Sequence, residues 1–71
     1  MRVPILLGRA IVKALANVGY CEVRQRGSHI RLSCAGKRSI TVPDHKVVGR
    51  GLLKKILRDA ELSAKDFMKL L

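Results

Sequence analysis

The chain has 71 residues, of which 48% are hydrophobic and only two are aromatic. This length predicts one domain with a thin core, and the hydrophobic content excludes an intrinsically disordered chain. Fifteen lysines and arginines stand against five acidic residues, so the formal net charge is +10 and a polyanionic partner such as nucleic acid is expected. With so few aromatic residues, a flat stacking platform for single-stranded bases is not expected.

The N-terminal residues MRVPILLGRAIVKALA resemble a targeting signal only superficially. Arg9 and Lys13 interrupt the apolar run, and no stretch approaches the roughly 20 residues of a membrane span. We therefore expect a single domain over residues 1–71 in a cytoplasmic protein that does not enter a membrane.

Hydrophobic periodicity predicts the first elements. Apolar residues recur at helical spacing from Leu7 to Val18, and Gly19 predicts the end of that helix. Residues 20–26 and 29–34 alternate with period two, and SITV at 39–42 predicts a third short strand before Pro43.

A second amphipathic helix is predicted from Leu52 to Ala60. Ser63 and Asp66 resemble a capping box, which predicts a short C-terminal helix from about residue 64. The resulting order is α-β-β-β-α with a short extra helix. We expect an α+β fold in which both long helices cover one face of a three-stranded antiparallel sheet.

The alternation also divides the strand residues between the two faces of this sheet. The expected core set is Cys21, Val23, Ile30, Leu32, Ile40 and Val42. The expected open face carries Glu22, Arg24, Arg26, His29, Arg31, Ser33, Ser39 and Thr41. His29 is therefore expected to point outward together with the arginines.

Gly27 and Ser28 fit a two-residue hairpin turn of type II′. This turn would pair Arg26 with His29, Arg24 with Arg31, Val23 with Leu32 and Cys21 with Cys34. Like charges directly opposite each other are destabilising, and a bound phosphate would relieve them. The alternative is that the long arginine side chains splay apart in water.

The remaining chemistry-bearing residues form no recognisable metal site. Cys21 and Cys34 have no ligand spacing with His29 or His45, so two reduced, buried thiols are expected, with a cross-strand disulfide as the alternative. The acids are scattered at positions 22, 44, 59, 61 and 66, so we expect no metal and no cofactor.

RNA cleavage without a metal needs a base for the 2′-hydroxyl, an acid for the leaving 5′-oxygen and cations for the phosphate. His29 is the candidate catalytic residue, since histidine can take either proton role. The candidate RNA- or phosphate-binding residues are Arg24, Arg26, Arg31, Ser28, Lys37 and Arg38, and Gly27 forms the turn that presents the site. For His45, in VPDHK, a loop or capping role is favoured over catalysis. These residues alone leave an enzyme and a passive RNA-binding module both open.

Three segments resemble the HicA (YcfA-like) toxins of HicAB toxin–antitoxin systems. They are IVKALANVGYCEVRQRGSHIRL, TVPDH and GLLKKILRDAELSAKDF, which together span about residues 8 to 67. The resemblance implies a double-stranded-RNA-binding-domain-like fold. It also implies an mRNA interferase that arrests growth, and a HicB antitoxin that binds the toxin and masks its histidine. The catalytic histidine of the family's GSH motif corresponds to His29, with Gly27 and Ser28 as the turn before it.

The leading hypothesis is therefore a metal-independent endoribonuclease toxin that acts on mRNA and is inhibited by a HicB-type antitoxin. The alternative is a non-catalytic double-stranded-RNA-binding module on the same fold. A DNA-binding regulator is disfavoured because the chain has no helix-turn-helix signature. The sequence does not indicate the oligomeric state of the free toxin.

Overall fold

The structure is a computed structural model that describes residues 5–44 and 47–71 of the chain. In chain order, the described elements are β1 (Leu6–Leu7), α1 (Gly8–Ala16), β2 (Cys21–Arg26), β3 (His29–Ser33), β4 (Ile40–Pro43), β5 (Val47–Val48), α2 (Arg50–Asp59) and α3 (Ala64–Met68).

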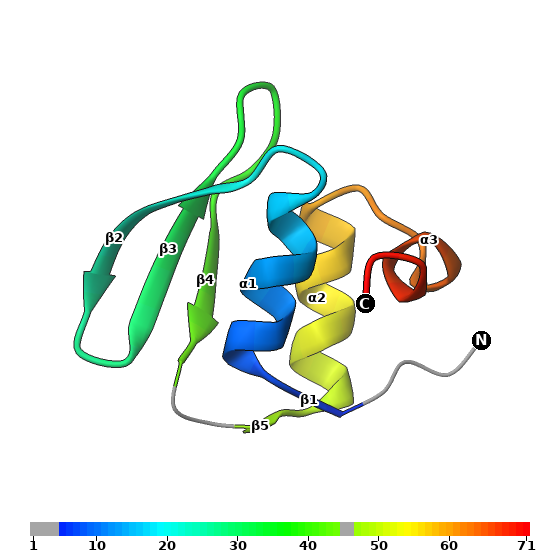
Figure 1. Ribbon diagram of the computed structural model, residues 1–71, viewed down its shortest axis with the longest axis horizontal. Helices are drawn as coiled ribbons and strands as arrows, with labels where there is room; N and C mark the ends of the chain where they lie inside the picture. Colours follow the sequence, from blue (N-terminus) through cyan, green and yellow to red (C-terminus); the bar gives the residue numbers. More distant parts are fainter. Residues whose placement is uncertain (1–4, 45–46) are drawn as a thin grey trace.

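The fold has two layers (Figure 1). Strands β2, β3 and β4 form an antiparallel sheet in that order, and α1 and α2 lie side by side over one of its faces. The short helix α3 packs against α2. This arrangement confirms the predicted α+β fold, with its three-stranded sheet, two long helices and short extra helix. It leaves the second face of the sheet uncovered by the described residues.

The hydrophobic core lies between the sheet and the helices, as the amphipathic patterns require. Its members are almost completely shielded from solvent; they include Ile11 and Leu15 of α1, Ile30 and Leu32 of β3, Ile40 and Val42 of β4, Leu53, Ile56 and Leu57 of α2, and Phe67 of α3. Four of the six strand residues predicted for the core are therefore confirmed, and all four belong to β3 and β4.

The helix boundaries differ slightly from those predicted. Leu7 belongs to β1 and takes the N-cap position of α1 with an extended backbone, and α2 begins at Arg50 instead of Leu52. At the start of α3, the Ser63 hydroxyl accepts a hydrogen bond from the Asp66 backbone N–H at 3.0 Å. This bond is the one that the Ser63 side chain makes in a capping box, so this part of the predicted motif is confirmed.

A second, two-stranded ladder was not predicted. Leu6 pairs with Val48 and Leu7 with Val47, so that β1 and β5 join the segment before α1 to the segment before α2. Each strand has only two residues, which is too short for any period-two pattern to appear in the sequence.

The predicted register of the β2–β3 hairpin is correct near the turn and wrong further from it. Arg26 pairs with His29 and Arg24 with Arg31, but the register shifts between Glu22 and Arg24. Leu32 therefore pairs with Glu22, and the expected core residue Val23 is 60% exposed. A β-bulge places one extra residue on one strand and shifts the residues beyond it, and simple alternation does not reveal it.

The same shift corrects the predictions for Glu22 and for the cysteines. Glu22 was expected on the open face, but it pairs with the buried Leu32 and contacts Arg9 of α1. Cys21 pairs with Ser33 and not with Cys34. Both cysteines are free thiols; Cys21 is exposed and Cys34 is half-buried, so neither is the fully buried thiol that we expected.

Candidate active site

A tight hairpin turn presents the candidate site. Gly27 and Ser28 are the two residues between β2 and β3, and Gly27 has a φ of 55°, a conformation that glycine adopts without the steric cost of a Cβ. A two-residue turn with positive φ at its first position only is the predicted type II′ pattern. The turn places Arg26 directly opposite His29 on the two strands.

The open face of the sheet contains a shallow concavity of about 230 Å³. Its lining residues come from all three strands: Arg24, Arg26, His29, Arg31 and Thr41. Three arginines and the histidine predicted for the site therefore surround one hollow, and no carboxylate of residues 5–44 or 47–71 lines it. Such a hollow is electropositive and suits an anion better than a cation.

Thr41 is a member of the site that the sequence analysis did not assign to it. Arg31 pairs with Thr41 across β3 and β4, and Arg31 Nη1 donates a hydrogen bond to Thr41 Oγ1 at 3.0 Å. This contact holds one guanidinium group against the sheet. The alternation predicted Thr41 on the open face, but the sequence does not show that Thr41 lies opposite Arg31.

The acidic residues near the hairpin are directed away from the concavity. Arg9 of α1 forms ion pairs with Glu22 at 3.1 Å and with Asp44 at 2.9 Å. Hydrogen bonds from Arg9 to these two carboxylates raise the pKa of its guanidinium group above its already high ordinary value. The two carboxylates therefore pair with Arg9 on the helix side of the sheet and do not neutralise the arginines of the open face.

Three other predicted residues do not line the concavity. Ser28 is half-buried in the turn, where its carbonyl accepts a hydrogen bond from the Asp44 backbone N–H at 2.6 Å. Lys37 and Arg38 lie between β3 and β4, at the end of the sheet opposite the Gly27–Ser28 turn. The Arg38 carbonyl accepts a hydrogen bond from the Tyr20 hydroxyl at 2.9 Å. His45 lies outside the described residues.

The described part of the chain contains neither a cluster of metal-binding side chains nor a helix suited to crossing a membrane. Within residues 5–44 and 47–71, no three histidine, cysteine, aspartate or glutamate side chains lie close enough together to hold a metal ion. In the same ranges, no helix has the length and apolar character needed to cross a membrane.

The fold and the concavity define a small α+β protein with a basic, histidine-containing open sheet face. Comparison with protein-family models gives one assignment: residues 8–62 match the family described as the HicA toxin of bacterial toxin–antitoxin. The chain therefore belongs to the HicA toxin family, as its sequence motifs suggested, and membership implies a cognate antitoxin. No curated protein matches the chain.

Proposed function

We propose that this toxin is an endoribonuclease that cleaves RNA without a metal ion, and that the concavity on the open sheet face is its active site. The observation that carries the proposal is the meeting of His29 with Arg24, Arg26 and Arg31 in one hollow. A histidine beside three guanidinium groups combines a proton-transfer group with binding sites for the phosphate oxygens.

The reaction begins when the 2′-hydroxyl of one nucleotide attacks the adjacent phosphorus. The O2′–P bond forms and the P–O5′ bond breaks, while a base removes the 2′ proton and an acid protonates the departing 5′-oxygen. His29 performs one of these two proton transfers. The products are a 2′,3′-cyclic phosphate and a free 5′-hydroxyl, so no water is consumed in this step.

The arginines stabilise the charge that develops on the phosphate. Arg31 is held by Thr41 at 3.0 Å, so one guanidinium group is already ordered before RNA binds. Donors that are fixed in advance stabilise a transition state better than donors that must reorganise. Because three guanidinium groups line the hollow, a divalent cation would be repelled from it.

The first experiment compares the wild-type toxin with His29→Ala and His29→Gln on an RNA substrate in excess EDTA. Both variants should bind RNA with similar affinity but cleave it about 100-fold more slowly or worse, because general acid–base catalysis supplies a factor of this size. A substrate with 2′-deoxyribose at the cleaved position should resist the wild-type protein. Equal cleavage by wild type and His29→Ala would sink the catalytic assignment. Binding by both proteins without cleavage would favour the passive RNA-binding module.

A modified substrate distinguishes the two proton roles of His29. If sulfur replaces the 5′-oxygen at the cleaved bond, the leaving thiolate needs no general acid. His29→Ala should then cleave the modified RNA almost as fast as wild type if His29 is the acid. If His29 is the base, the full deficit of the variant should persist.

The cognate antitoxin is proposed to be a HicB-type protein that covers His29. The support is electrostatic: the chain has a net charge of +10, and its open sheet face carries the arginines of the concavity. An acidic partner would be attracted to this face and would compete there with RNA.

A further inference from the structure

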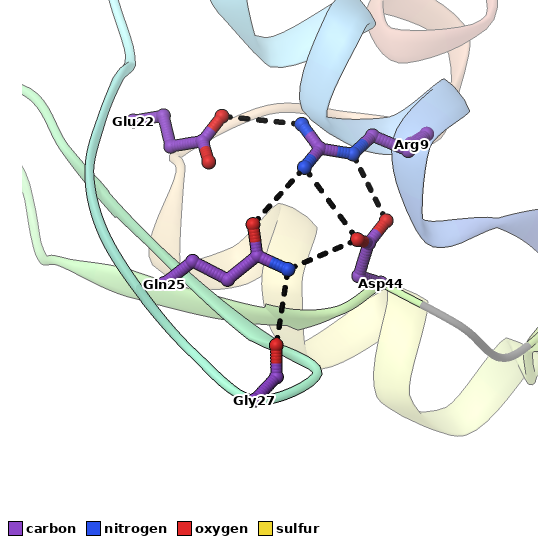
Figure 2. A network of polar contacts seen from close by, with 5 residues as sticks. All are labelled: Arg9, Glu22, Gln25, Gly27 and Asp44. Carbon is purple, nitrogen blue, oxygen red and sulfur yellow. Dashed lines mark hydrogen bonds and ion pairs between the residues drawn. The ribbon is translucent and has the colours of Figure 1, made fainter.

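Behind the concavity, on the helix side of the sheet, a network of polar contacts joins α1 to the β2–β3 hairpin and the end of β4 (Figure 2). Its centre is the Arg9 guanidinium group, whose three nitrogens all donate: Nε to Asp44 Oδ1 at 2.9 Å, Nη1 to Glu22 Oε2 at 3.1 Å and Nη2 to Gln25 Oε1 at 3.2 Å. The fork geometry of arginine allows this one side chain to hold two residues of β2 and the residue that follows β4 at the same time.

The network continues from Arg9 to the hairpin turn. Gln25 Nε2 donates to the Gly27 carbonyl at 3.0 Å and to Asp44 Oδ2 at 3.1 Å, and the Asp44 backbone N–H donates to the Ser28 carbonyl at 2.6 Å. Both residues of the turn are therefore held by the network through their carbonyl groups. The next residue in the chain is His29.

The bulge in β2 helps to assemble this network. Because the register shifts between Glu22 and Arg24, Glu22 pairs with Leu32 while Gln25 pairs with Ile30. Leu32 and Ile30 are both buried under the helices, so Glu22 and Gln25 both face Arg9. Strict alternation would have left Glu22 on the opposite face of the sheet from Gln25.

Close packing at the start of α1 places Arg9 beside Asp44. A Cβ atom at Gly8 would lie 1.9 Å from the Pro43 carbonyl oxygen, so only glycine permits this approach of the helix to the end of β4. The Arg9 side chain is nevertheless 52% exposed. Ion pairs with this exposure contribute little to global stability, so the network is better suited to fixing local geometry than to holding the fold together.

We propose that Arg9, through Gln25 and Asp44, is a positioning residue for catalysis: the network clamps the Gly27–Ser28 turn and so sets where His29 lies relative to the arginines of the concavity. This inference rests on the proposed ribonuclease function. Displacements of about 1 Å are enough to lower a reaction rate by as much as 100-fold, so a turn released from this clamp should still bind RNA but cleave it poorly.

The test compares Arg9→Gln and Gln25→Ala with the control Lys13→Gln. Lys13 is exposed one helical turn after Arg9 and lies outside the network, so its substitution removes the same charge from the same helix. Under single-turnover conditions, both network variants should cleave about tenfold more slowly or worse. Their dissociation constants for RNA and their unfolding midpoints should stay close to those of the control. Unchanged cleavage rates, or rate losses that only follow a loss of global stability, would overturn the proposal.

Two further measurements separate this inference from the proposed function. Hydrogen exchange at the amides of Gly27, Ser28 and His29 should accelerate in both network variants and not in Lys13→Gln, whether or not the protein cleaves RNA; unchanged exchange would refute the clamp itself. In a His29→Ala background, Gln25→Ala should cause no further loss of cleavage. A loss of the same size in that background would show that the network does not act through His29. If His29→Ala alone cleaves like wild type, the proposed function fails, while the exchange result still decides the clamp.

Discussion

Arg24 and Arg31 face each other across β2 and β3, and Arg26 faces His29 two pairs closer to the turn. Like charges at directly opposite positions destabilise a sheet by a few tenths of a kcal/mol, and among the described residues no carboxylate lines the concavity to offset them. The protein tolerates this arrangement because all four side chains are exposed. A phosphate group bound between the arginines would attract each of them and so offset their mutual repulsion.

Tyr20 connects the core to the segment between β3 and β4. It is only 3% exposed, and its hydroxyl donates to the Arg38 carbonyl at 2.9 Å. Burial raises the pKa of Tyr20 above its ordinary value of 10. The folded state therefore holds the phenolic proton more tightly than the unfolded state does.

Tyr20→Phe should lower the free energy of unfolding by about 1 kcal/mol at neutral pH, because the Arg38 carbonyl loses its hydrogen-bond partner. The contribution of Tyr20 is fully present below the pKa of the unfolded chain and is lost as pH rises through the higher pKa of the folded state. The stability difference between wild type and variant should therefore shrink above pH 10. Urea unfolding measured from neutral to alkaline pH checks this; a difference that stays constant would contradict it.

At the scale of elements, close packing joins the start of α1 to the end of β4. Gly8 is buried at the first position of α1 and lies against Pro43, the last residue of β4. The first turn of the helix and the end of the strand are thus in backbone contact. Arg9 and Asp44 follow these residues directly, so the polar network depends on this packing.

Gly8→Ala should destabilise the protein by about 2 kcal/mol, because the added methyl group must displace the Pro43 carbonyl. Gly51→Ala is the matched control: Gly51 is exposed in the first turn of α2, and beyond its chain neighbours and its own helix backbone no atom of the described residues lies within 4 Å of an added Cβ. Alanine is the better helix former, so this control should gain about 0.5–1 kcal/mol. Denaturant unfolding of the two variants tests the contrast. A shift of both in the same direction would contradict the close packing at Gly8.

At the scale of the whole molecule, the basic residues of the sheet region occupy two separate places. Arg24, Arg26 and Arg31 line the concavity near the turn, whereas Lys37 and Arg38 lie beyond the other end of β3. A five-residue strand is about 16 Å long, so a phosphate bound beside Arg26 and His29 at the turn lies well away from Lys37 and Arg38. If both groups of basic residues bind RNA, the RNA strand must run along the open face from one end of the sheet to the other.

The salt dependence of RNA binding tests this path. Each phosphate neutralised on a single strand contributes roughly 0.7 to the slope of log K against log salt concentration. Arg31→Gln should reduce the slope by about that amount, and Lys37→Gln with Arg38→Gln should reduce it by up to twice as much. Lys54→Gln, on the exposed side of α2, is the control and should change the slope least. If the double variant behaves like this control, Lys37 and Arg38 do not contact RNA.

Much of the candidate site could be predicted from local sequence because local rules determine it. The Gly27–Ser28 turn is set by the conformational freedom of glycine, and the alternation next to the turn puts Arg24, Arg26, His29 and Arg31 on one face. The amphipathic spacing likewise predicted α1 and α2, since a helix of this kind must bury its apolar stripe against the sheet.

The tertiary structure alone decided what lies behind this face. The register shift at Val23 could not be read from the alternation of the strand. The β1–β5 ladder and the contacts of Arg9 join residues that are distant in sequence; Arg9 and Asp44 are 35 positions apart. No periodicity records such contacts, because their geometry depends on how the helix packs on the sheet. The sequence by itself determined that Arg24, Arg26, His29 and Arg31 share the open face, and the packing decided which groups hold the turn that carries His29.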